Sequence, residues 1–88
     1  MKIEVRITQE FEREAKRFLR KYISLREELE KLFNELRNDP AYGESLGSGL
    51  RKLRLSVKSK GKGKRGGLRV ITFLDVHTYQ DSNGILWL

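Results

Sequence analysis

The chain has 88 residues, which is the size of one small domain, and 38% of them are hydrophobic. It contains no cysteine and one histidine, His77, which excludes disulfides, cysteine-ligated zinc and any metal site built on two histidines. No apolar run approaches the roughly 18 residues that cross a bilayer, and no export signal is recognisable. We therefore expect one domain over residues 1–88, soluble and cytoplasmic, with no metal or other cofactor.

The positive charge is concentrated in the middle of the chain. Residues 1–44 carry 10 basic and 10 acidic side chains, residues 45–74 carry 9 basic and no acidic ones, and residues 75–88 carry only 2 acidic ones. The net charge of +7 therefore comes from the middle segment. Because the composition is too apolar for a disordered tail, the sequence predicts a folded domain whose basic surface binds phosphate or an acidic partner.

The first part of the sequence predicts a strand followed by a helix. Residues 2–7 alternate apolar and charged side chains, which indicates a strand with one buried face. Thr8 is a suitable N-cap, and the apolar residues that follow recur at spacings of three and four. These features predict a helix over about residues 9–21.

A second helix is predicted directly after the first. Ser24 and Glu27 fit a capping box at its start, and its leucines repeat the apolar spacing of the first helix. Pro40 ends it, because the residue before a proline is pushed towards extended backbone. Two such helices form an antiparallel hairpin whose apolar side needs a sheet to cover.

The second half of the sequence predicts three further strands. Residues 52–57 and 68–76 alternate, and residues 85–88 follow an Asn-Gly turn signal. Residues 58–67 contain no apolar side chain and form a glycine-rich basic loop. The expected fold class is α+β, in the order β-α-α-β-β-β, with the helix hairpin packed on a small antiparallel sheet.

The basic segment supplies the candidate functional residues. Eight cationic side chains occur within residues 52–69 with no carboxylate among them: Lys52, Arg54, Lys58, Lys60, Lys62, Lys64, Arg65 and Arg69. A nucleic-acid phosphate backbone complements such a run, although a solvated loop that keeps the protein soluble would explain it equally well.

Three of these cations are predicted to lie on the sheet. Lys52 and Arg54 project from the same face of one strand as Arg69 does from the next, provided that the two strands pair. Three fixed cations could hold a scissile phosphate and its developing negative charge. In the alternative interpretation Arg69 is a surface arginine paired with Asp75 or Glu44.

His77 shares strand parity with Arg69 and is the other candidate for chemistry. A histidine titrates in the range that suits proton transfer, but a lone histidine is more often structural. Both interpretations of His77 stay open.

Two segments resemble the RelE/HigB superfamily of toxins from type II toxin-antitoxin systems: GLRKLRL at residues 49–55 and GKGKRGGLRVI at residues 61–71. The first helix and the Asn38-Asp39-Pro40 end of the second are also similar to members of that family. The resemblance covers nearly the whole chain. It implies a RelE-like, microbial-RNase-type fold in a single toxin domain over residues 1–88.

The resemblance also implies an activity and partners. Members of the family are metal-independent mRNA endoribonucleases that act on ribosome-bound mRNA, and a cognate antitoxin covers their basic surface. Carried over by position, Arg69 would contact the scissile phosphate, Lys52 and Arg54 would form the basic pair on the preceding strand, and the loop cations from Lys58 to Arg65 would grip RNA. No small-molecule cofactor and no membrane partner are implied.

One departure from the family pattern creates a second hypothesis. Family members continue past the last strand into a segment such as Tyr-x-Lys that supplies an active-site group, whereas this sequence ends at Trp87-Leu88. The alternative function is a catalytically inactive or truncated toxin-like module that binds antitoxin, RNA or both. In the enzymatic hypothesis His77 would compensate as a proton-transfer group.

Overall fold

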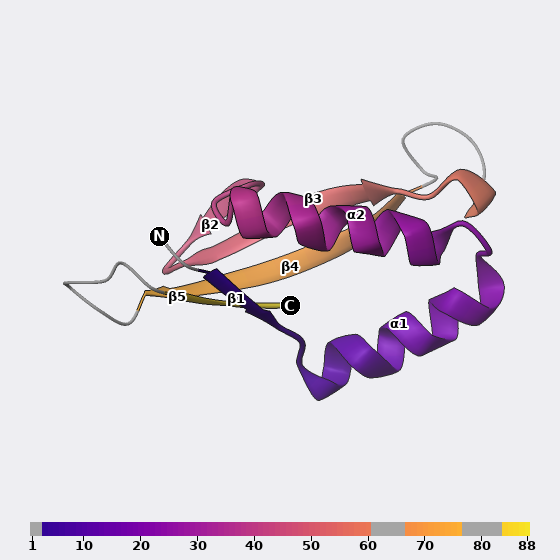
Figure 1. Cartoon of the computed structure of the whole chain (residues 1–88), viewed down its shortest axis with the longest axis horizontal. Helices are drawn as coiled ribbons and strands as arrows, with labels where there is room; N and C mark the ends of the chain where they lie inside the picture. The colour runs from indigo at the N-terminus through magenta and orange to yellow at the C-terminus, as the bar shows by residue number, and fades with distance from the viewer. Residues whose placement is uncertain (1–2, 61–66, 77–83) are drawn as a thin grey trace.

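The computed structural model describes residues 3–60, 67–76 and 84–88. Its elements are β1 (Ile3–Arg6), α1 (Gln9–Lys21), α2 (Leu25–Asn38), β2 (Glu44–Gly47), β3 (Leu50–Ser56), the short 3₁₀ helix η1 (Lys58–Lys60), β4 (Gly67–Val76) and β5 (Gly84–Trp87) (Figure 1). The predicted α+β class is confirmed, and the bounds of α1 are those predicted.

The five strands form one mixed sheet in the order β1-β5-β4-β3-β2. The pairs β2–β3, β3–β4 and β4–β5 are antiparallel, whereas β1 pairs with β5 in parallel. The prediction of an antiparallel sheet is therefore wrong at one edge. The physical reason is topological, since β1 and β5 are connected through the helix hairpin and strands β2, β3 and β4 rather than by a tight turn.

The predicted element order also lacked β2. All four residues of β2 are exposed, so they carry no alternation of buried and exposed positions that a sequence pattern could reveal. A tight turn with positive φ at Gly47, Ser48 and Gly49 connects β2 to β3 and makes the pair a hairpin.

The core lies between α2 and one face of the sheet (Figure 1). The apolar stripe of α2 supplies its four buried leucines: Leu25, Leu29, Leu32 and Leu36. They meet the strand residues Leu53, Val70 and Leu86, of which Leu86 is fully buried, as is Leu36 on the helix. Alternate residues of β3 and β4 therefore face α2, and the residues between them face the other way.

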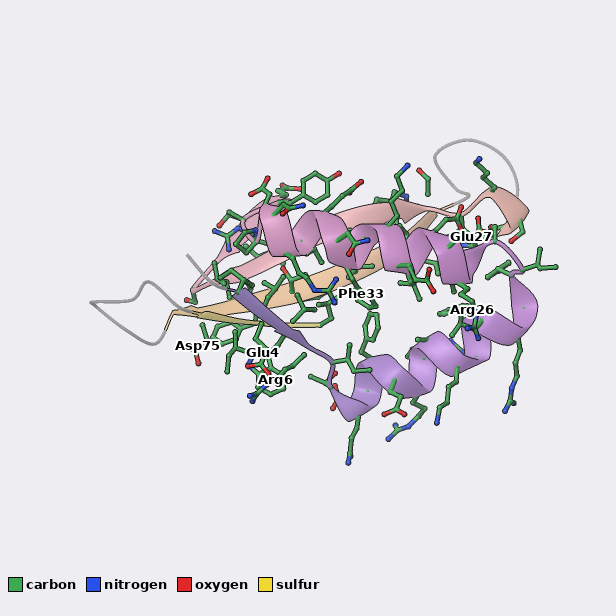
Figure 2. All side chains as sticks on the ribbon, in the orientation of Figure 1. Glu4, Arg6, Arg26, Glu27, Phe33 and Asp75 are labelled. Atoms are coloured by element: carbon green, nitrogen blue, oxygen red, sulfur yellow. The ribbon has the colours of Figure 1, made fainter. Side chains whose placement is uncertain are left out.

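Helix α1 is packed less deeply than α2. The Thr8 hydroxyl accepts a hydrogen bond of 3.1 Å from the Phe11 amide, which confirms the predicted N-cap. None of the residues of α1 is buried, and a cavity of about 230 Å³ lies between α1, α2 and the sheet. Phe33 points from α2 towards α1 (Figure 2), where its ring centroid is 6.3 Å from that of Phe11.

The predicted capping box at Ser24 is wrong. Ser24 makes no side-chain cap bond; its hydroxyl instead lies 2.9 Å from the Glu28 carboxylate and 2.9 Å from the hydroxyl of Ser59 in η1. The other oxygen of Glu28 accepts a bond of 2.9 Å from the Lys58 amide. Ser24 and Glu28 thus bond to Lys58 and Ser59 of η1. These hydrogen bonds join the start of α2 to the segment that follows β3, and they replace the predicted cap.

No helix in the described part of the chain is long and apolar enough to cross a membrane.

Candidate functional site

The face of the sheet opposite α2 holds the three predicted sheet cations. In the antiparallel register of β3 and β4, Arg54 pairs with Arg69 and Lys52 pairs with Ile71. The predicted pairing of these strands is therefore confirmed, and it places Lys52, Arg54 and Arg69 on one face. We call these three residues the basic cluster. Their roles remain predictions.

The two arginines of the basic cluster occupy directly opposed positions on β3 and β4, and no carboxylate among the described residues pairs with either. Among the described residues, neither Arg54 nor Arg69 forms an ion pair or a side-chain hydrogen bond. Like charges at directly opposed positions on neighbouring strands repel and destabilise the pair. An anion bound between the two guanidinium groups would relieve that repulsion, and a phosphate can accept paired hydrogen bonds from each of them.

The basic cluster borders a shallow hollow of about 230 Å³ that is lined by Glu44, Lys52, Leu53, Arg54 and Arg69. The Lys52 ammonium lies 3.6 Å from the Glu44 carboxylate, and both side chains are substantially exposed. Glu44 thus pairs with Lys52, whereas the sequence-based alternative paired it with Arg69. The hollow therefore combines one exposed, solvent-screened ion pair with two arginines that form no ion pair within the described residues.

Glu44 is the residue of this hollow that sequence reasoning missed as a functional candidate. Its place depends on Gly43, which has φ of +115° and lies so close to β3 that an added Cβ would be 2.8 Å from the Lys52 carbonyl oxygen. The signal in the sequence was that Gly43 directly precedes the carboxylate Glu44 at the start of a glycine-rich stretch. Chemically, Glu44 differs from the guanidinium groups because a carboxylate can accept a proton.

The loop cations are only partly described. Lys58 and Lys60 form η1 at the end of β3, and the Lys60 ammonium donates a hydrogen bond of 3.1 Å to the Gly67 carbonyl oxygen. Lys60 is therefore tied to the start of β4, whereas Lys58 is exposed. The remaining candidates, Lys62, Lys64, Arg65 and His77, lie outside the described residues. Their proposed roles stay predictions.

Comparison with known proteins gives no match to a family model, to a curated protein or to a solved structure. No group of three or more His, Cys, Asp or Glu side chains within residues 3–60, 67–76 and 84–88 is arranged to hold a metal ion.

Proposed function

We propose that the basic cluster binds a phosphate of RNA and that the protein is a toxin-type, metal-independent mRNA endoribonuclease. The observation that supports the proposal is the opposed pair Arg54 and Arg69, which lacks a counter-charge among the described residues. A bound phosphate would supply that charge. Because both arginines stand on paired strands, the sheet holds their backbone positions side by side before a ligand binds.

Cleavage at such a site would use the 2′-hydroxyl of the ribose as the nucleophile against the adjacent phosphorus. The 2′-oxygen forms a bond to phosphorus, the bond to the 5′-oxygen breaks, and the leaving oxygen takes a proton from water. Arg54 and Arg69 would stabilise the negative charge that grows on the phosphate oxygens. Of the side chains lining the hollow, Glu44 is the one that can accept the proton of the 2′-hydroxyl.

The same proposal includes the finer points of fold and partners. The two helices on a mixed sheet would be a variant of the RelE-like fold, the substrate would be ribosome-bound mRNA, and the protein would act in the cytoplasm. A cognate antitoxin would cover the basic cluster and silence the enzyme. These statements rest on the resemblance of residues 49–55 and 61–71 together with the position of the arginines.

The proposal is tested by primer extension on a reporter mRNA in a translating extract. The wild-type chain is expected to produce discrete cuts, and Arg69→Ala to reduce them by about 100- to 1,000-fold, because it removes one donor to the developing charge. Arg13→Ala, which removes an exposed arginine from α1, serves as the matched control and should cut like wild type. Circular dichroism verifies that both variants fold.

Intact mRNA in all lanes, from folded protein, would contradict the enzymatic proposal. The alternative function would then be a non-catalytic module that binds antitoxin or RNA, since phosphate binding needs only the opposed arginines. In that case Arg69→Ala should weaken RNA binding and reduce its dependence on salt concentration.

A further inference from the structure

An apolar strip adjoins the basic cluster on the face of the sheet opposite α2, which we call the open face. The register aligns Leu50 of β3 with Phe73 of β4, and Phe73 with Trp87 of β5. Leu50 is 39% exposed and Phe73 is 37% exposed, and Trp87 is half-buried. We call these three residues the apolar strip. Large apolar side chains grouped on an open sheet face are more often an interaction site than isolated exposed ones are.

Along β4, the side chains on the open face change from basic to apolar to acidic. Arg69 lies in the basic cluster, Ile71 is 42% exposed next to Lys52, and Phe73 lies in the apolar strip. The distance from Arg69 to Phe73 is four residues of strand, or roughly 13 Å. The next residue on this face is Asp75, which marks an acidic end.

The far side of the apolar strip is held in place by β1. Arg6 lies over the Trp87 ring, with its guanidinium carbon 5.6 Å from the ring centroid. The same guanidinium donates a 3.1 Å hydrogen bond to the Glu4 carboxylate, and Figure 2 shows Glu4 and Arg6 together on β1. Arg6 is thus paired with Glu4, whereas Arg54 and Arg69, which form no ion pair in the part of the chain that the structure describes, lie on β3 and β4.

We propose that the apolar strip is a stacking platform for an unpaired RNA base, attached to the strand whose phosphate occupies the basic cluster. This inference rests on the proposed function and specifies its substrate as single-stranded RNA. One ligand must offer an anion at Arg54 and Arg69 and a flat apolar group about 13 Å away. Unpaired RNA offers both, because its phosphates and its splayed bases belong to the same chain, whereas a duplex hides the bases in its stack.

The experiment uses Trp87, which is the single tryptophan of the chain and therefore reports directly on the strip. The protein is titrated with a short oligouridylate and, separately, with an RNA duplex of the same length, and affinity and Trp87 fluorescence are recorded together. Saturation with the single strand is expected to quench Trp87, and the duplex is expected to leave its emission unchanged.

Two matched variants locate the effect. Phe73→Leu keeps an apolar side chain but removes the ring, and it is expected to weaken oligouridylate binding roughly 5- to 150-fold while leaving duplex binding unchanged. Phe33→Leu makes the same change on α2, between the helices and on the other side of the sheet, and should bind like wild type (Figure 2).

The outcomes separate the platform from the proposed function. If the single strand binds in an Arg69-dependent way but Phe73→Leu binds equally well, or Trp87 emission does not change, the platform is wrong and the phosphate site survives. If neither RNA binds, the proposed function fails and the platform with it. Self-association of the wild-type chain that Phe73→Leu abolishes would instead identify the strip as a protein contact, which also overturns the platform.

Discussion

At the scale of single residues, two partly or fully buried polar side chains on the covered face of the sheet reduce the stability of the fold. Arg51 pairs across the strands with Thr72, and both face α2 rather than the basic cluster. An Arg51 guanidinium nitrogen and the Thr72 hydroxyl are the two buried side-chain atoms in the described part of the chain that have no hydrogen-bond partner. Such groups reduce stability, because water satisfied them in the unfolded chain.

Replacing Thr72 by valine should therefore stabilise the protein. Valine keeps the β-branched shape at a position that is 1% exposed and removes the unsatisfied hydroxyl, so the free energy of unfolding should rise by about 1 kcal/mol. Urea denaturation measures the change. The same change at an exposed position, Thr8→Val, is the contrasting variant: it is expected to lower stability, because it removes the hydroxyl that accepts the hydrogen bond of the Phe11 amide. A decrease for Thr72→Val would mean that the hydroxyl has a partner in solution.

At the scale of elements, α1 depends strongly on its ends. Its first turn contains Glu10 and Glu12 and its last turn contains Arg20 and Lys21, so the charges at both ends complement the helix dipole. The Thr8 hydroxyl satisfies the Phe11 amide, and α1 has no buried side chain to compensate for the loss of that bond. Capping therefore contributes a larger share of the stability of α1 than of α2.

Thr8→Ala is expected to lower the free energy of unfolding by about 1 kcal/mol, because the Phe11 amide loses its acceptor. Thr8→Ser keeps the hydroxyl and is the matched control, with an expected change of only a few tenths of a kcal/mol. Thermal unfolding followed at the helical circular dichroism signal measures both variants. Equal losses for alanine and serine would show that the methyl group of Thr8, rather than its hydroxyl, stabilises this turn.

At the scale of the whole molecule, the two helices differ in how firmly they are held. The four leucines of α2 are buried against the sheet, whereas the apolar side of α1 borders a cavity of about 230 Å³. Opening α1 would expose less apolar surface than opening α2, so it should require less free energy. The molecule is best described as a core of α2 and the sheet, against which α1 packs with side chains that are only partly buried.

Native-state hydrogen exchange should therefore detect α1 opening before the rest of the protein. Backbone amides in the middle of α1 are expected to exchange through a local opening of lower free energy than those of α2 and β4. Leu36→Ala, at a fully buried position, should reduce the global free energy of unfolding by about 2–5 kcal/mol. The difference in opening free energy between α1 and the rest of the protein should then become smaller. Equal protection of the two helices in the wild-type chain would contradict the description of α1 as a separately opening element.

Local patterns in the sequence determined most elements of the fold and the cations of the site. Residues 68–76 alternate with the period of a strand, and the apolar residues in 9–21 recur with the period of a helix. Each element could therefore be recognised without knowing which other element covers it. The same alternation placed Lys52 and Arg54 on one face, because side-chain direction in a strand has a period of two.

The tertiary structure decided how these elements meet. Glu44 joins the hollow only because Gly43 lets β2 approach β3, and β2 has no buried face that would mark it as a strand. The parallel pairing of β1 with β5 joins the two ends of the described chain, and no local pattern specifies such a contact. Likewise, Ser24 bonds to Ser59 rather than capping α2. Each of these contacts depends on residues far apart in the sequence, whose proximity is fixed only when the sheet and the helices pack together.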